Sequence, residues 1–297
     1  MIKVISSGIF SSIQDQGRFG YRKWGVPVSG AMDAFSARLS NQLVNNPVEA
    51  AVIEMTYSGA SLQFLCETLI AITGGDFAPT LNGRSIPLNS PIVIKTGDLL
   101  RIGAARYGLR CYLAVSGGIA VAPILGSRSY HPNVAPDYRL QKGQLLPIGE
   151  SLKKTSHNHA IVRIKKAHFE DPAIPVHEGP EFNLLPKNMQ SLLLNTPFTI
   201  SNESNRMGYR LEMNKTLTAP EIITSAVQPG TVQLTPSGQL IVLMRDCPTT
   251  GGYARVLQLT EEGVSRLGQR HSSYISTSSD TSNCSTLRSS CFFLSAR

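Results

Sequence analysis

Short apolar runs that stop at glycine-containing turns recur along this chain and restrict it to a β-rich fold. Residues 69–73, 91–95 and 110–115 are such runs, and a turn with glycine follows each of them. Runs of this length that contain Val, Ile and Thr are typical of strands. The pattern predicts helices in two places, over residues 31–44 and residues 186–194.

A polar, turn-rich stretch over residues 150–166 marks the best domain boundary. It separates two β-rich halves. A chain of 297 residues is long enough for two such units. We therefore predict one domain over residues 1–150 and a second over residues 160–269. Residues 270–297 are rich in Ser and Thr without an apolar period, which is typical of a disordered tail.

Charge and cysteine content exclude several classes of protein. The net charge is +8, but the basic residues are scattered and form no stripe with aromatic residues, so we expect no nucleic-acid partner. No apolar run is long enough for a membrane helix, and the first residues do not resemble a signal peptide, so we expect no membrane partner and a cytoplasmic protein. The five cysteines form no C-x-x-C pair, and His157 and His159 have no further ligand nearby. We therefore expect no metal site.

A loop that follows the apolar run 239–244 carries the first candidate site residues. It combines an acid, two hydroxyls, two glycines and an aromatic residue, namely Asp246, Thr249, Thr250, Gly251, Gly252 and Tyr253. Glycines allow a close backbone approach to a ligand, and the hydroxyls can orient it. Tyr253 could stack on a planar ring or donate its hydroxyl. Because these loops contain no histidine, Asp246 is the predicted general acid/base or orienting carboxylate.

Four further segments place arginines and small polar residues in glycine-bounded loops. Asp15 and Arg18 lie three residues apart, where they either pair with each other or hold a ligand. Ser29, Gly30 and Asp33 precede the first predicted helix, where they either bind an anion or cap the helix. Arginine grips carboxylates through paired hydrogen bonds, so we add Arg128, its neighbour Ser129, and Arg206.

These motifs, in this order, resemble the allophanate-hydrolase-subunit-2 family, also called biotin-dependent carboxyltransferase-like, whose common bacterial member is the 5-oxoprolinase C subunit. The resemblance runs from about residue 2 to about residue 269. It implies two tandem cyclophilin-like β-barrel domains with a few short helices, whereas spacing alone gives two β-rich units. Family members end in a closing strand, and the resemblance to it is lost after residue 269. We therefore expect a frameshift or an altered terminus, with a barrel strand missing and an edge exposed.

The resemblance also implies an activity. It suggests an amide (lactam) hydrolase subunit that works only with companion subunits, in an ATP-dependent complex that converts 5-oxoproline to glutamate. The arginines, with Arg18 and Arg206 foremost, would neutralise a small carboxylated lactam, and Asp246 would move or orient a proton. The alternatives are a biotin-dependent carboxyltransferase similar to that of urea carboxylase, and a non-catalytic partner-binding antagonist of a kinase inhibitor.

The cofactors expected from the sequence belong to partner chains. There is no P-loop motif, so ATP would be used by the complex as a whole or at a different kind of phosphate site. No segment matches a site of covalent biotin attachment, so biotin is expected only if a partner carries it. A nucleophilic serine or cysteine with a histidine base is poorly supported, because the motif loops contain no histidine.

Overall fold

The computed structural model describes residues 1–150, 162, 164, 167–213, 217–218, 222–271 and 291–294. The chain divides into two compact units, and each is considered by itself. The first contains residues 1–21 and 28–165, and the second contains residues 22–27 and 166–297. The short segment 22–27 therefore belongs to the second unit although its flanks belong to the first. The expected boundary at residues 150–160 falls almost entirely outside the described residues.

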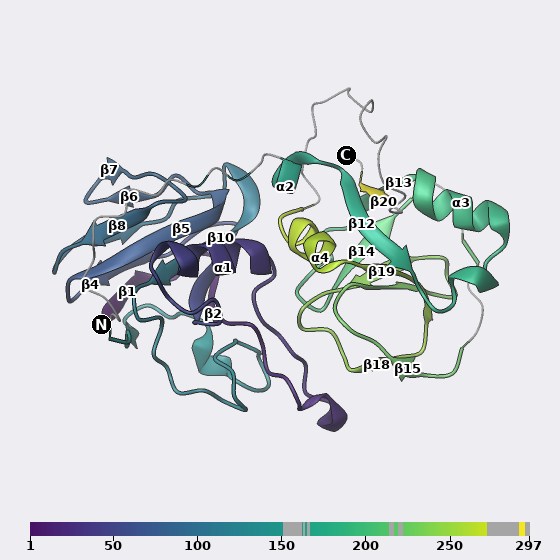
Figure 1. The fold of residues 1–297 in the computed structure, drawn as a ribbon, viewed down its shortest axis with the longest axis horizontal. Coiled ribbons are helices and arrows are strands. Elements are labelled where there is room, and N and C mark those ends of the chain that lie inside the picture. Colours follow the sequence, from purple (N-terminus) through teal and green to yellow (C-terminus); the bar gives the residue numbers. More distant parts are fainter. Residues whose placement is uncertain are drawn as a thin grey trace. The chain divides into compact units, whose positions relative to one another are not determined.

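The described residues of the first unit form two antiparallel sheets, one α-helix and one short 3-10 helix (Figure 1). One sheet has the order β11-β1-β4-β9-β6-β7 and the other has the order β2-β3-β10-β5-β8. Its elements are β1 (Ile2–Ser6), β2 (Phe10–Gln14), α1 (Ala34–Leu43), β3 (Val52–Thr56), β4 (Ser61–Phe64), β5 (Thr68–Asp76), β6 (Thr80–Leu81), β7 (Arg84–Ser85), β8 (Pro91–Ile94), β9 (Leu99–Arg101), β10 (Tyr107–Val115), the 3-10 helix η2 (Pro136–Tyr138) and β11 (Leu145–Leu146).

Both faces of β5 and β10, which are neighbours in the five-stranded sheet, are buried, and this explains their long apolar runs. In β5, Ile70 and Ile72 belong to the core between the sheets, whereas Ala71 belongs to a second core beneath α1. In β10, Leu113 lies in the first core and Ala114 in the second. Successive residues of a strand point to opposite faces. A strand covered on both sides therefore needs a continuous apolar run rather than an alternating one.

The second unit is a closed barrel with the strand order β12-β19-β16-β17-β14-β13-β20, and β15 pairs with β18 beside it. Its elements are η1 (Arg22–Trp24), α2 (Ala167–Glu170), β12 (Ala173–Glu178), η3 (Phe182–Leu184), α3 (Lys187–Asn195), β13 (Pro197–Ile200), β14 (Gly208–Glu212), β15 (Ser225–Ala226), β16 (Thr231–Leu234), β17 (Leu240–Leu243), β18 (Thr250–Gly251), β19 (Ala254–Leu259), α4 (Glu261–Leu267) and β20 (Cys291–Leu294).

The prediction of a mainly β fold is confirmed, and both predicted helices exist as α1 and α3. The expectation of a missing closing strand is wrong for this structure. The β20 backbone pairs antiparallel with β12 and parallel with β13, and so completes the barrel (Figure 1). Arg270, the first residue of the predicted disordered tail, is buried and donates to the Asp171 carbonyl oxygen at 2.7 Å.

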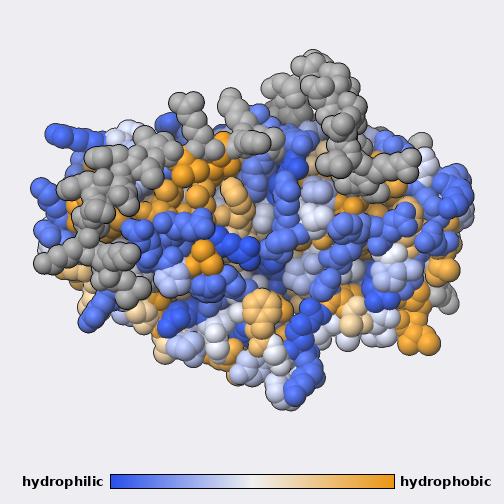
Figure 2. All heavy atoms as spheres, viewed as in Figure 1, coloured by the Kyte–Doolittle hydropathy of each residue, from blue (hydrophilic) through white to orange (hydrophobic). Residues whose placement is uncertain are grey.

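The surface carries a mixture of residue types. On the face that Figure 2 shows, hydrophilic residues cover much of the described surface and are interrupted by smaller hydrophobic patches. Among the helices that the structure describes, none is both long and apolar enough to cross a membrane. Large exposed apolar side chains include Trp24 in the second unit, which lies beneath the ammonium group of Lys23.

Candidate functional site

The Asp15 carboxylate organises the predicted loops of the first unit. Asp15 follows β2, and its Oδ1 accepts hydrogen bonds from the hydroxyls of Ser127 and Ser129, each at 2.6 Å. The same oxygen accepts from the Gly17 amide at 2.8 Å, and Oδ2 accepts from the Arg128 amide at 2.5 Å. One carboxylate therefore joins the loop after β2 to the loop that contains residues 127–129.

The two arginines of this cluster hold backbone carbonyls. Arg18 is fully buried, and its Nη2 donates to the Ser129 carbonyl oxygen at 2.5 Å. Arg128 is half-buried, and its Nε donates to the Val121 carbonyl oxygen at 2.6 Å. The structure brings Asp15, Arg18, Arg128 and Ser129 together in contacts that brace the loops. Their predicted role in binding a ligand stays a prediction.

The Ser29–Gly30 turn is strained and tightly enclosed. Ser29 has a φ of 61° and Gly30 a φ of 101°, in the region where side chains other than glycine are disfavoured. A Cβ on Gly30 would lie 3.1 Å from the carbonyl carbon of Gln16. The Ser29 hydroxyl is buried and has no hydrogen-bond partner within the described part of the chain. Strain of this kind persists where the surroundings determine the backbone.

Asp33 is the N-cap of α1. Its two carboxylate oxygens accept from the amide and the hydroxyl of Ser36, at 3.0 and 2.6 Å. The Asp33 amide donates to the Tyr112 hydroxyl at 2.8 Å, and the Met32 amide donates to Glu54 Oε2 at 2.7 Å. Of the two possibilities that the sequence leaves open, these contacts favour the helix cap over an anion site.

Glu54 and Tyr112 are buried polar residues that the sequence interpretation missed. The Tyr112 hydroxyl donates to Glu54 Oε2 at 2.9 Å, and Arg110 Nε lies 3.7 Å from Glu54 Oε1. Burial, and then the nearby Glu54 carboxylate, raise the pKa of Tyr112 well above its usual value, so its hydroxyl stays a donor. The sequence does contain one signal of this network, because a glutamate within the apolar run 52–55 needs a polar partner when it is buried.

Arg206 and Asp246 form a buried, two-pronged ion pair in the second unit. Arg206 Nε lies 2.7 Å from Asp246 Oδ2, and Nη2 lies 3.1 Å from Oδ1. The Asp246 amide also donates to the Arg206 carbonyl oxygen at 2.9 Å. Because both carboxylate oxygens hold a guanidinium, the pair stabilises the ionised acid and favours a structural role. Acid/base catalysis by Asp246 stays a prediction.

The loop after this pair forms a small second sheet. Thr250 and Gly251 are β18, which pairs with β15. A Cβ on Gly251 would lie 2.4 Å from Gln233 Nε2, so a glycine fits this position. Gly252 follows, and Tyr253 is exposed over 43% of its surface. The Thr249 carbonyl oxygen accepts from the Val227 amide at 3.1 Å. Tyr253 therefore has a surface available for a ligand or a partner.

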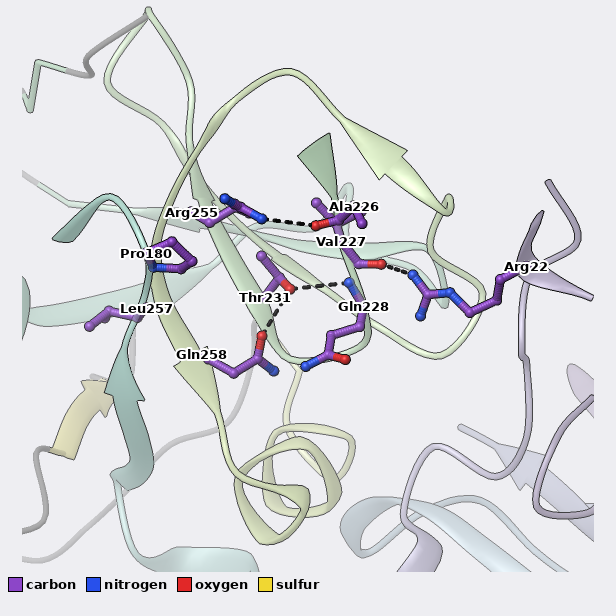
Figure 3. Close-up of a pocket in the computed structure, with 9 residues that line it drawn as sticks. All are labelled: Arg22, Pro180, Ala226, Val227, Gln228, Thr231, Arg255, Leu257 and Gln258. Atoms are coloured by element: carbon purple, nitrogen blue, oxygen red, sulfur yellow. Dashed lines mark hydrogen bonds between the residues drawn. The ribbon is translucent and has the colours of Figure 1, made fainter. Parts of the chain in front are cut away.

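A pocket of about 550 Å³ lies in the second unit beside these loops (Figure 3). Its volume is in the range of small-molecule sites. Apolar and polar side chains line it, namely Arg22, Pro180, Ala226, Val227, Gln228, Thr231, Arg255, Leu257 and Gln258. None of these residues is among the predicted site residues, although Val227 contacts the predicted Thr249 through its backbone.

Much of the polar lining already has hydrogen-bond or ion-pair partners in the second unit. Arg255 makes a two-pronged ion pair with Glu181, with Nε–Oε2 at 2.9 Å and Nη2–Oε1 at 2.7 Å. The hydrogen bonds from Arg255 lower the pKa of Glu181, which therefore stays ionised and compensates the arginine. The Gln258 carboxamide accepts from the Thr231 hydroxyl at 2.9 Å and donates to the Pro229 carbonyl oxygen at 3.0 Å.

Arg22 and Gln228 are the polar residues of the lining with unused hydrogen-bonding groups. Arg22 Nη2 donates to the carbonyl oxygens of Val227 and, at 3.4 Å, Thr249. Figure 3 shows this guanidinium reaching the loop that carries Val227 and Gln228. Within the described residues, Arg22 has no acidic partner and the Gln228 side chain makes no hydrogen bond.

Cys247 lies close to this wall but is not reactive in the form that the structure shows. It packs with Val227 and Leu243 in a small apolar cluster. Burial raises the pKa of its thiol to about 12, against a smaller lowering by Arg22. A thiol with this pKa is protonated at neutral pH and is a poor nucleophile.

The comparisons with known proteins identify the class. The family model for the carboxyltransferase domain, subdomain A and B, matches residues 24–274, and the chain belongs to this family. Among individual relatives, the chain is 33% identical to the 5-oxoprolinase C subunit of Escherichia coli (strain K12). The match covers 91% of this chain and 87% of that protein. The resemblance inferred from the motifs is therefore confirmed.

Solved structures also match this chain over about nine-tenths of its length. The crystal structure of TTHA0988 matches with a TM-score of 0.81 and 29% identity, over 91% of this chain but 53% of that chain. The urea carboxylase of Kluyveromyces lactis matches with a TM-score of 0.79 and 29% identity, over 90% of this chain and 26% of that chain. In both structures, the matched chain extends well beyond the region that this chain covers.

Proposed function

We propose that this chain is a subunit of an ATP-dependent 5-oxoprolinase complex that opens the lactam of 5-oxoproline to glutamate. The observation that carries the proposal is the similarity to the 5-oxoprolinase C subunit, which extends over most of both chains. A match of 30% identity over 91% of this chain and 87% of the Haemophilus influenzae protein of the same name supports it further. We propose companion subunits as its partners for the same reason.

The second-unit pocket and the first-unit loops are the proposed working parts. Opening a lactam breaks its amide C–N bond, adds water and leaves a carboxylate and an amine. ATP, used by the complex, supplies the driving force for this unfavourable step. This chain would bind and orient the substrate through the pocket beside the loop 249–253 and through the cluster of Asp15, Arg18, Arg128 and Ser129. Rigid loops are suited to this task because positioning requires a fixed geometry.

The roles of the predicted residues follow from their contacts. Arg206 and Asp246 would fix the loop that leads to Thr249 and Tyr253, because the two side chains form a buried ion pair with each other. Asp15 would fix the loops on which Arg128 and Ser29 lie. Tyr253 is exposed and would contact the substrate or a companion subunit. We therefore place direct substrate contact on the pocket lining and Tyr253 rather than on Asp246.

Reconstitution with companion subunits tests the proposal. Glutamate release from 5-oxoproline should require ATP, the companion subunits and this chain together. The Arg210→Gln variant, which changes an exposed residue of β14, controls for activity that is lost during purification and reconstitution. If the companion subunits release glutamate at the same rate without this chain, the proposed function is wrong. Tight assembly without turnover under all conditions would support a purely partner-binding role instead.

A second candidate function is biotin-dependent carboxyl transfer. The family match and the similarity to Kluyveromyces lactis urea carboxylase favour it. Biotin would be carried by a partner, and its ureido ring could pair with the Gln228 carboxamide, whose groups are unused in the described residues. Carboxyl transfer from a biotinylated partner to urea, measured beside glutamate release, separates the two functions. Transfer without glutamate release would favour this second candidate.

A further inference from the structure

The second-unit pocket contains one arginine whose charge is not compensated by an acid within the described residues. Arg22 comes from the first part of the chain, yet its segment 22–27 belongs to the second unit. Its Nη2 is held by carbonyl oxygens, whereas its Nε and Nη1 have no partner in the described part of the chain. A guanidinium that is fixed in this way keeps donors available for a ligand, and little side-chain entropy remains to be lost on binding.

The neighbouring ionisable groups do not neutralise Arg22. Arg255, the other cation of the lining, is paired with Glu181, and the nearby Asp246 is paired with Arg206. Cys247 is buried close by and carries its proton at neutral pH. The described part of the pocket therefore has one surplus positive charge, in a partly buried place where electrostatic attraction is stronger than in bulk water.

The remaining lining restricts the ligand to a small and partly apolar molecule. Pro180, Val227 and Leu257 supply apolar surface, and the Gln228 carboxamide offers one donor and one acceptor group. The volume of about 550 Å³ suits a compact molecule. A small acid with an amide next to its carboxylate would satisfy Arg22 and Gln228 together.

We propose that this pocket binds a compact carboxylic acid and that Arg22 is the specificity-determining residue that selects the acid over its neutral analogues. The inference rests on the proposed function where it names the ligand, because 5-oxoproline is such an acid. The carboxylate would lie on the Arg22 guanidinium, and the lactam would lie toward Gln228. The selectivity itself depends only on the charge of Arg22 and the pairing of its neighbours.

Binding to the full chain, with companion subunits present, tests the selectivity. The probes are 5-oxoproline and its uncharged carboxamide, 5-oxoprolinamide, measured by calorimetry against the wild type, Arg22→Gln, Arg22→Lys and Lys23→Gln. Lys23 is a matched control, since it is exposed, charged and adjacent in the same short helix. The wild type should prefer the acid by about tenfold to a hundredfold, the range expected for a charged hydrogen bond.

The variants decide between a binding role and a structural role. Arg22→Gln should lose the preference for the acid, Arg22→Lys should retain part of it, and Lys23→Gln should behave as the wild type. As a second readout, phenylglyoxal should modify Arg22 in the absence of ligand, and a bound acid should protect it. If Arg22→Gln unfolds, protection of Arg22 in the wild type still gives the answer.

Failure of this inference and failure of the proposed function give different results. If the complex releases no glutamate but another small acid protects Arg22, the site assignment stands and the substrate is that acid. If glutamate is released and Arg22→Gln retains the full preference for the acid, the assignment of Arg22 is overturned while the function stands. Absence of any acid preference in the wild type also overturns it.

Discussion

Two ion pairs of the second unit have the same chemistry but very different exposure. Arg206 and Asp246 have side chains that are 10% and 6% exposed, whereas those of Arg210 and Glu203 are 47% and 70% exposed. Removing one member of a buried pair leaves an unpaired buried charge, whereas surface pairs are weak because water screens them. The buried pair therefore contributes to the fold in a way that the exposed pair does not.

Arg206→Ala should lower the free energy of unfolding by about 3–5 kcal/mol, and Arg210→Ala by about 1 kcal/mol or less. Urea denaturation of both variants measures the difference. If Arg206→Ala unfolds like the wild type while turnover is lost, the pair is catalytic and its assignment to a structural role is wrong.

Glu181 gives a pH-dependent contribution whose sign is fixed by its partner. Hydrogen bonds from Arg255 lower the pKa of Glu181 below its usual 4.5. A lowered pKa in the folded state contributes stability that is present above pH 4.5 and lost as the pH falls through the folded value. Glu181→Gln should remove this acid-side loss, measured as unfolding free energy between neutral and acidic pH. Exposed Glu203→Gln should keep the wild-type slope.

At the scale of single elements, the start of α1 separates a cap from a ligand site. Asp33 accepts from the Ser36 amide, as an N-cap does. Asp33→Ala should cost about 1–2 kcal/mol of stability, and Asp33→Asn, which keeps an accepting oxygen, about 0.5 kcal/mol or less. Thermal unfolding measures both variants. Equal stability of all three proteins, with ligand binding lost in both variants, would instead support the anion-site alternative.

The closing strand β20 provides a test of the barrel. It pairs with β12 and β13, so its removal exposes two strand edges. A chain that ends at residue 271 should therefore unfold at least about 5 °C lower than the full chain and associate more readily. Differential scanning calorimetry and light scattering measure the two effects. An unchanged melting temperature would show that the barrel does not depend on this strand.

The elements that sequence predicts well are those whose local pattern decides their structure. The strands β5 and β10 follow from continuous apolar runs, because both of their faces are covered. The start of α1 was placed three residues early, because contacts from Glu54 and Tyr112 hold Met32 and Asp33 outside the helix. Strand β20 was missed because four residues in a Ser/Thr-rich tail gain their partners only when the barrel closes.

The candidate site follows from sequence only in part, for a reason of chain distance. Asp15 and Ser129 were recognised because each lies in a motif loop. Arg22 was missed because its role depends on Val227, which lies 205 residues away. No local pattern records such a contact. The same holds for Arg255 and Glu181, whose pairing across 74 residues depends on the fold of the barrel.

At the scale of the whole molecule, the family and the fold agree. A mainly β chain with a closed barrel in its second unit matches structures of carboxyltransferase-domain proteins over about nine-tenths of its length. The matched structures belong to longer chains, of which this chain spans 53% and 26%. This coverage is compatible with the proposal that the chain works with companion subunits.

Substrate binding in the second-unit pocket is tested most sharply by kcat/KM for 5-oxoproline, in a complex reconstituted with wild-type, Arg22→Gln or Lys23→Gln chains. We predict that Arg22→Gln lowers kcat/KM by about tenfold to a hundredfold, mainly through a higher KM, and that Lys23→Gln stays within about twofold of the wild type. Equal kcat/KM values for the two variants would contradict the assignment of substrate binding to this pocket.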